Sequence, residues 1–329
     1  MLVGASGCDK RETRERRKRG GGETVQAPIP SDWVPSSARE VTPTGELPTE
    51  VRQRTGCRPD LNPVEIAKDQ ITRLERAFRE ASRISDEEEA RVGDRLEKGL
   101  SNVPAFRGKW DLAADVKRYV PYVQALVDHL STHAKRKGLR YRVHVVRDDA
   151  FNAFALPGGV LAFHTGLFDG PSAVKSEAEL AAVMGHEIAH VELRHPIAVY
   201  QYARLVLGED AAAAEIIAQI LTRSLSSQHE LEADDLGVEL AARAAYDPMA
   251  AARLWERMGG EEPAGAIDTL EGLILGAIDA LIRSHPPSPA RCHRAVTQSV
   301  RARREGWHPV YYRGETNLRE RVLGPRRPH

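Results

Sequence analysis

Residues 186–190 read His-Glu-Ile-Ala-His, inside the stretch SEAELAAVMGHEIAHVELRHP at residues 176–196, and this stretch decides the fold. It carries an H-E-x-x-H motif. On a helix, positions i and i+4 lie on one face, so His186 and His190 can direct ring nitrogens at a single metal ion. Glu187 then lies beside that ion, where its carboxylate can take a proton from a zinc-bound water and pass it to a leaving amine. The motif therefore predicts hydrolysis of peptide bonds.

The sequence around the motif is typical of a helix. Ser176 and Glu179 have the spacing of a capping box, and an alanine-rich stretch with apolar residues at helical spacing follows. Pro196 stops the pattern. We expect a helix over residues 177–195 that presents both histidines.

A third ligand is needed, because catalytic zinc sites combine three protein ligands with one open position. A histidine six residues after His190 is excluded, since residue 196 is proline. His195 comes one residue too early. We interpret it as a helix-end cap or a surface residue, with a role in the site as the lesser alternative.

A second stretch, residues 226–237, offers the missing ligand. Glu230 and Asp234 are four positions apart and share a helical face. This suits one metal ligand and one carboxylate that supports a ligating histidine or assists proton transfer. The alternative is a solvated acidic face, because runs of acidic residues usually lie in water.

These motifs resemble the Peptidase M48 family of zinc metalloproteases. As in that family, the H-E-x-x-H motif is followed by Glu230-Leu-Glu-Ala-Asp234 and then by Ala245-Tyr-Asp-Pro248. Residues 152–168 resemble the strand segment before the zinc helix, and Ser284-His-Pro-Pro-Ser-Pro-Ala-Arg291 resembles the later His-Pro segment. The motifs occur in the family's order.

The resemblance covers roughly residues 65–295 and is nearest in type to single-domain periplasmic lipoprotein members of the family. It departs at Ser227, where an arginine is common, and at Ala245, where a glycine is common. Neither departure touches the predicted metal ligands. The first affects substrate contacts or helix packing.

The resemblance implies one Zn²⁺ per chain and hydrolysis of protein substrates. His186, His190 and Glu230 would be the zinc ligands, and Glu187 would be the general base that activates the zinc-bound water. The motif on its own also leaves other divalent metals open, since two histidines and a carboxylate suit several of them.

Three further residues receive roles from the resemblance. Asp234 matches a position assigned to proton donation or to support of the site. His285 matches a histidine that approaches the metal and in some members holds the enzyme inactive; the alternative is an ordinary residue of a proline-rich turn. Arg291 matches an arginine that steadies an oxyanion or anchors its loop; the alternative is a structural ion pair.

Two strands are expected before the zinc helix. Residues 141–147 have strand composition, and a second strand is expected over residues 160–165, with a connecting turn or close backbone approach at Gly158 and Gly159.

We expect residues 158–165, beginning with Gly158, Gly159 and Val160, to be an exposed edge strand. An extended peptide substrate would pair with it, main chain to main chain. Such binding depends little on side chains, which suits misfolded or unassembled proteins as substrates. His164 either faces this substrate or, as we favour, is buried across the sheet.

Composition excludes some classes of protein. Of 329 residues, 41% are hydrophobic and 29% are charged, which indicates a globular protein, and the formal net charge of zero gives no general attraction to nucleic acid. The most apolar window, residues 264–282, carries Asp268, Glu271 and Asp279, too many charges for a membrane span.

The N-terminal sequence Ala5-Ser-Gly-Cys8 resembles the end of a bacterial lipoprotein signal, although the charged and most of the apolar part of such a signal are missing. Cys8 is therefore a candidate for lipidation, which would anchor the protein in the cell envelope facing the periplasm. The alternative is a chance match and a soluble protein. Cys57 and Cys292 would then remain as a candidate disulfide pair.

Three parts are expected along the chain. Residues 1–62 form the leader and a disordered basic and proline-rich tether, for which a nucleic-acid arm is the lesser alternative. Residues 63–296 form the zinc metallopeptidase domain. Residues 297–329 form a basic C-terminal tail that either wraps the domain or stays loose.

The predicted fold class is α+β, a predominantly helical, zincin-like domain with a small β-sheet. Besides the zinc helix, helices are expected at residues 63–97, 111–137, 200–225, 228–245 and 247–258.

The leading functional hypothesis is a zinc-dependent endopeptidase of cell-envelope protein quality control. The alternative is a latent or chaperone-like protein that binds clients while His285 blocks its zinc site. A closed structural zinc site fits less well, because structural sites need no adjacent base such as Glu187.

Overall fold

The computed structural model describes most of the predicted catalytic domain. The described residues are 41–43, 84–100, 109, 116, 119–170, 172–208, 227–259, 289–308 and 310–323. They are mostly helical with a small mixed sheet, so the predicted α+β class is confirmed. In chain order the helices are α3 (Asp86–Leu100), α5 (Val120–Ser131), α6 (Gly166–Asp169), α7 (Glu177–Glu192), α8 (His195–Leu207), α10 (Ser227–Arg243), α11 (Met249–Gly259), α13 (Pro289–Arg304) and α14 (Glu315–Leu323).

The main sheet has three strands, β2 (Arg142–Val146), β3 (Ala153–Leu156) and β4 (Val160–His164), in the order β2-β4-β3. Strand β2 is parallel to β4, and β3 is antiparallel to it. The two predicted strands are therefore confirmed, and the sheet has a further strand before the turn.

The predicted substrate-binding edge strand is wrong. Strand β4 lies in the middle of the sheet, and Val160 faces Arg142 on one side and Leu156 on the other. Gly158 and Gly159 belong to the 3₁₀ turn η2 (Pro157–Gly159) rather than to a strand. Because both sides of β4 are already paired, no extended peptide can add to it.

The turn before β4 depends on its two glycines. Gly158 and Gly159 have φ angles of 75° and 85°, in the left-handed region that side chains disfavour. A Cβ on Gly158 would lie 2.6 Å from the Cα of Ala90 in α3. The predicted turn and close approach are both present.

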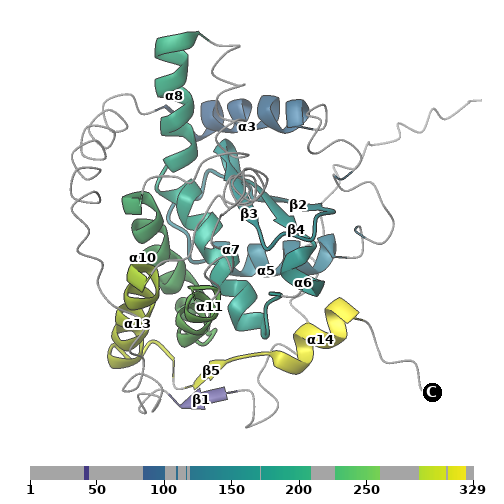
Figure 1. Ribbon diagram of the computed structural model, residues 1–329. Coiled ribbons are helices and arrows are strands. Elements are labelled where there is room, and N and C mark those ends of the chain that lie inside the picture. The colour runs from purple at the N-terminus through teal and green to yellow at the C-terminus, as the bar shows by residue number, and fades with distance from the viewer. Residues whose placement is uncertain are drawn as a thin grey trace, which may run out of the picture.

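Helix α7 is the centre of the fold. Figure 1 shows it between the three-stranded sheet and the group formed by α10, α11 and α13. Its residues 177–191 are all buried, which explains why the helix is apolar on most sides rather than amphipathic. Ser176 caps its start, because the Ser176 hydroxyl accepts from the Glu179 N–H at 3.2 Å, as predicted.

Helix α7 ends three residues earlier than expected. Arg194 has a φ of 62°, which breaks the helix, and His195 with Pro196 opens α8 instead of closing α7. The Arg194 guanidinium reaches Asp86 at 2.7 Å and the buried Glu89 at 3.0 Å. These ion pairs to α3 hold the strained turn in place.

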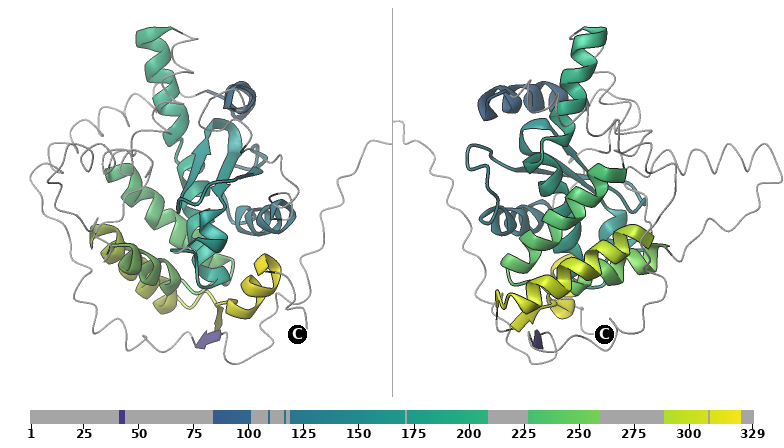
Figure 2. Two further views of the ribbon diagram at one scale, coloured as in Figure 1. Left: turned by 45° about the vertical axis from the view of Figure 1, so that its right-hand side comes forward. Right: turned by 90° about the vertical axis from the view of Figure 1, so that its left-hand side faces the viewer.

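The described part of the C-terminal segment, residues 297–308 and 310–323, packs onto the domain. The predicted boundary at residue 296 falls inside α13. Strand β5 (Val310–Tyr312) pairs with β1 (Val41–Pro43), so part of the predicted tether is also a strand, and Figure 2 shows both beneath the helices. Tyr311 and Tyr312 are buried.

Several predictions concern parts of the chain that the structure does not describe. The remainder of residues 1–62 with Cys8 and Cys57, residues 63–83, residues 209–226 and the apolar window 264–282 lie outside the described residues. Helix α5 covers residues 120–131 of the helix expected over 111–137, of which residues 111–115, 117 and 118 lie outside the described residues. None of the described helices has both the length and the apolar character that crossing a membrane requires.

Candidate metal centre

Three buried side chains meet at one point. His186, His190 and Glu230 each offer an atom within 4.8 Å of the others. The Nε2 atoms of His186 and His190 lie 2.9 Å apart. Glu230 places one oxygen 3.3 Å from His186 Nε2 and the other 3.6 Å from His190 Nε2. Two imidazole nitrogens and one carboxylate oxygen, converging in a buried position, fit the donor set of a zinc ion.

Two helices supply these three residues. His186 and His190 lie one turn apart on α7, and Glu230 lies in the first turn of α10. The helices pack backbone against backbone where Gly185 meets Gly237. The sequence spacing alone places the histidines, but the third residue depends on this packing.

The surroundings of His186 favour positive charge. Burial and the nearby Arg291 oppose protonation of its ring, but Asp234 and Glu230 outweigh them and raise the pKa of His186 to about 9. The Nδ1 atom of His186 lies 2.9 Å from Asp234. Asp234 therefore accepts from His186 on the side of the ring that faces away from His190 and Glu230.

Asp234 is also paired with Arg291 through two nearly parallel hydrogen bonds of 2.7 Å and 2.8 Å. Burial raises the pKa of Asp234, but the Arg291 guanidinium and the hydrogen bonds from Arg291 and His186 outweigh burial and hold it below its ordinary value. Asp234 is therefore ionised and hydrogen-bonded to both Arg291 and His186. A carboxylate in this state can hold the His186 ring in place, but it has no proton to donate.

Arg291 is a buried part of this cluster. Its Nη1 lies 3.3 Å from Glu230, and its guanidinium lies 3.9 Å from the ring centre of Trp255. Burial lowers the pKa of Arg291, but Asp234, Glu230 and Glu187 more than compensate, so its pKa is raised. Its donors point at two carboxylates, which matches the structural ion pair among the two predicted alternatives.

Glu187 is buried next to His186 on α7, and its negative charge contributes to the raised pKa of Arg291. The charges within the cluster therefore include three carboxylates and one guanidinium. His285, the other residue predicted to approach the metal, lies outside the described residues.

His195 was predicted as a helix-end cap or surface residue, and that prediction is wrong. Its side chain is fully buried, and its Nδ1 lies 2.8 Å from Nδ1 of His190. It also stacks on His229 with ring centres 4.2 Å apart. The sequence carried only a weak signal, a histidine five positions after His190, because the turn at Arg194 that redirects the chain is not visible in the sequence.

His164 is buried in the sheet, as the favoured alternative has it. Its ring meets Phe154 edge to face and lies 3.8 Å from Asp148. Burial lowers the pKa of His164 to about 4, against the attraction of Asp148.

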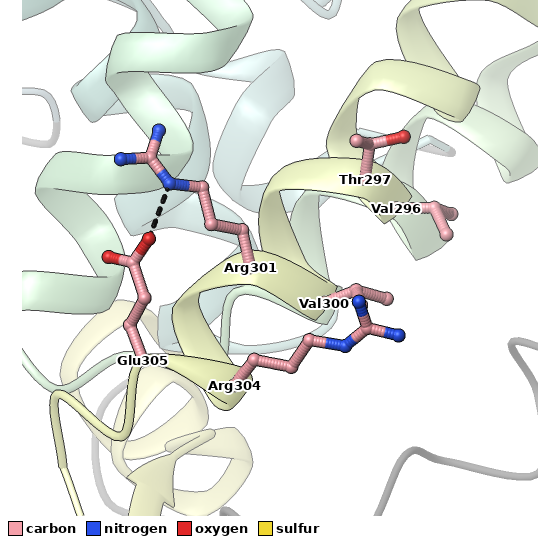
Figure 3. Close-up of a pocket in the computed structure, with 6 residues that line it drawn as sticks. All are labelled: Val296, Thr297, Val300, Arg301, Arg304 and Glu305. Atoms are coloured by element: carbon pink, nitrogen blue, oxygen red, sulfur yellow. Dashed lines mark hydrogen bonds and ion pairs between the residues drawn. The ribbon is translucent and has the colours of Figure 1, made fainter.

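A separate surface hollow of about 420 Å³ lies along α13 (Figure 3). Figure 3 shows its side chains coming from the later turns of α13, whereas Arg291 lies in the first turn. It is lined by Val296, Thr297, Val300, Arg301, Arg304 and Glu305. It contains none of the candidate ligands.

Cys292 follows Arg291 in α13 and is buried. It takes part in a disulfide, but Cys8 and Cys57 both lie outside the described residues, so the predicted pairing with Cys57 stays a prediction.

Comparison with known proteins identifies the family of this chain. The sequence profile of Peptidase family M48 matches residues 118–298, more than half of the chain. The chain belongs to Peptidase family M48. The matched span includes His186, His190, Glu230 and Arg291, and the predicted family is confirmed.

Relatives of this M48 chain occur in eukaryotes and bacteria. Mitochondrial metalloendopeptidase OMA1 of Schizosaccharomyces pombe is 32% identical over 184 residues, 53% of this chain and 51% of that protein. The beta-barrel assembly-enhancing protease of Escherichia coli is 28% identical over 188 residues, 51% of this chain and 38% of that protein. A putative beta-barrel assembly-enhancing protease of Vibrio cholerae is 33% identical over 161 residues, 43% of this chain and 33% of that protein. The chain spans about half or less of the length of these relatives.

Proposed function

We propose that this protein is a zinc-dependent endopeptidase. The observation that carries the proposal is the convergence of His186, His190 and Glu230 within 4.8 Å, with Glu187 directly adjacent in α7. Membership of Peptidase family M48 and relatives named as metalloendopeptidase and protease support it.

In this proposal His186, His190 and Glu230 hold the zinc ion. Zinc with three protein ligands lowers the pKa of a bound water to about 7 and polarises a substrate carbonyl. Glu187 is the general base: its carboxylate accepts a proton and later gives it to the leaving amine nitrogen. Burial of the cluster keeps bulk water away, which strengthens these electrostatic effects.

Asp234 and Arg291 position the site. Asp234 holds the His186 ring by accepting from Nδ1, so that Nε2 is left to face the metal. Arg291 pairs with Asp234 and with the nearby Glu230, and its positive charge offsets part of the repulsion between the buried carboxylates. Asp234 therefore has a supporting role in this proposal rather than the alternative role of proton donor.

The proposed substrates are proteins, and unfolded chains are suitable substrates for the test. The names of two relatives refer to beta-barrel assembly, and the name of a third refers to mitochondria. On the basis of these names, the proposed role of this chain is protein quality control in the cell envelope. Anchorage through Cys8 and the division into leader, peptidase domain and C-terminal segment remain part of the same proposal.

The test compares purified wild-type protein with Glu187→Gln for zinc content, casein degradation and self-cleavage. Glu239→Gln is the matched control, because Glu239 lies on α10 in an ordinary ion pair with Arg243. We expect chelator-sensitive activity in the wild type and the control, and zinc-loaded but inactive Glu187→Gln protein. Equal activity of Glu187→Gln and wild type would remove Glu187 from the mechanism.

A zinc-loaded wild type without activity would contradict an active resting enzyme. The variant His285→Ala then distinguishes a latent enzyme from a protein that binds clients without cleaving them. Activity gained by this variant indicates latency, whereas continued inactivity favours a protein that binds clients without cleaving them.

A further inference from the structure

The His190 ring has a buried partner on the side away from the metal-ligand cluster. Its Nδ1 lies 2.8 Å from Nδ1 of His195, and Nε2 of His195 lies 3.3 Å from an oxygen of Glu232. The other oxygen of Glu232 accepts from Gln228 at 3.1 Å. These side chains form a continuous line from the cluster to a partly exposed carboxylate on α10.

We propose that His195 is a positioning residue that fixes the tautomer and orientation of His190, with Glu232 as its anchor. The inference rests on the proposed function, because it takes His190 as a zinc ligand. His190 can bind zinc through Nε2 only when its proton is on Nδ1. That N–H requires an acceptor, and Nδ1 of His195 lies at hydrogen-bond distance.

The proton positions along this line are mutually determined. Nδ1 of His195 can accept only if the His195 proton is on Nε2. An N–H at Nε2 then points toward Glu232, and a carboxylate can only accept, so Glu232 favours this tautomer over the other. Each proton therefore has one consistent place, from Glu232 to the nitrogen that faces the metal.

The two histidines of the motif are supported differently. His186 donates to Asp234 directly, whereas His190 reaches a carboxylate through the intervening His195 ring. Partners of this kind raise the basicity of a ligating histidine and hold its ring in place. The arrangement supplies such support to both rings.

His195 is held firmly enough to act in this way. Its side chain is fully buried and stacks on His229, with an angle of 22° between the ring planes. The residue before it, Arg194, is fixed by ion pairs to Asp86 and Glu89. Because packing and the turn at Arg194 already hold His195 in place, it loses little conformational freedom when it pairs with His190.

The test measures zinc affinity by competition with a chelator, together with circular dichroism and unfolding of the zinc-free protein. His195→Phe keeps the ring that stacks on His229 but removes the acceptor. His195→Asn restores an acceptor, because its Oδ1 can take the place of Nδ1. Glu232→Leu removes the anchor. His164→Phe is the matched control, a buried histidine whose contacts are with Phe154 and Asp148.

We expect His195→Phe to weaken zinc binding about 10–100-fold, with recovery of most of the loss in His195→Asn and a smaller loss in Glu232→Leu. The control keeps wild-type affinity. In zinc-loaded wild-type protein, ¹⁵N nuclear magnetic resonance should find the His195 proton on Nε2. This spectrum decides the question without a variant and so remains decisive if His195→Phe fails to fold.

A His195 proton on Nδ1, or a folded His195→Phe protein that binds zinc within about threefold of wild type, would overturn the inference. In those cases the proposed function stands, provided that the wild type binds zinc. A wild type that binds no zinc overturns the proposed function and this inference together.

Discussion

Gly185 in α7 and Gly237 in α10 lie backbone against backbone. A Cβ on Gly185 would lie 2.6 Å from the Gly237 carbonyl oxygen, and a Cβ on Gly237 would lie 2.7 Å from the backbone nitrogen of His186. No side chain separates the helices here, and this closeness lets Glu230 of α10 reach the two histidines of α7. The distance between two helices thus sets the geometry of the candidate metal site.

Substitution at this crossing is therefore expected to damage both stability and metal binding. Gly185→Ala and Gly237→Ala each push backbone atoms apart, and we expect a loss of about 1–3 kcal/mol in the free energy of unfolding. Zinc affinity should fall as Glu230 moves away. Denaturant unfolding and chelator competition measure the two effects.

The two glycine substitutions provide their own control. Because both act on one contact, the double variant should lose less stability than the two single losses added together. Fully additive losses, or single variants with wild-type stability and zinc affinity, would show that the helices can separate at no cost.

The residue at position 245 is a site of backbone strain. Ala245 has a φ of 66°, and it ends α10 with the N–H of Ala245 on the Ala242 carbonyl and the N–H of Tyr246 on the Ala241 carbonyl. This arrangement usually places glycine at the left-handed position. Ala245→Gly should therefore stabilise the protein by about 0.5–1 kcal/mol, net of the greater freedom of glycine in the unfolded chain.

Ala241→Gly serves as the comparison, because Ala241 lies within α10. It should destabilise the protein by about 1 kcal/mol. Urea unfolding of both variants checks the pair, and destabilisation by Ala245→Gly would contradict the assigned strain.

Glu97 of α3 gives a pH-dependent contribution to stability. The hydrogen bond between Glu97 and His144, 2.7 Å long, is the main cause that lowers the pKa of Glu97. Burial raises this pKa, but Arg142, 2.8 Å away, lowers it further, and the pKa falls to about 2. A carboxylate with a lowered pKa in the folded state stabilises that state fully above the ordinary pKa of 4.5. The stabilisation is lost progressively as the pH falls from 4.5 toward 2.

Glu97→Gln should accordingly cost on the order of 0.5–1 kcal/mol at pH 7. The difference from wild type should shrink as unfolding is measured at pH values below 4.5. A difference that stays constant down to pH 3 would show that the charge of Glu97 contributes nothing.

Asp234 tests the support of His186. Asp234→Asn keeps the shape of the side chain but removes its charge and one of its acceptors. Its remaining oxygen can still accept from His186 and from Nη2 of Arg291, but the hydrogen bond from Nε of Arg291 to Oδ2 is lost, because an NH₂ group would face that donor. We expect zinc affinity to fall about 10–100-fold. Asp235→Asn is the control, since Asp235 pairs with Arg294 away from the ligand cluster. Unchanged zinc affinity in Asp234→Asn would show that the negative charge of Asp234 contributes nothing to zinc binding.

Local patterns in the sequence predicted the helices of the site well. Three features of the site depend on interactions within one helix: the cap at Ser176, the spacing of His186 and His190, and the shared face of Glu230 and Asp234. Such interactions act over a few residues and are therefore visible in the sequence.

The errors concern interactions between distant segments. Whether β4 lies at an edge depends on which strands pair with it, and β3 fills the side that the sequence left open. The place of His195 depends on the turn at Arg194, whose partners Asp86 and Glu89 lie over a hundred positions earlier. The fit of Tyr312 beside Tyr246 likewise joins remote parts of the chain.

A crystal structure of the zinc-loaded protein, with anomalous data collected at the zinc absorption edge, tests the position of the metal most directly. We expect one strong peak about 2.0–2.2 Å from Nε2 of His186, Nε2 of His190 and a carboxylate oxygen of Glu230. A zinc peak held by other residues, or zinc-loaded crystals with no peak among these three side chains, would contradict it.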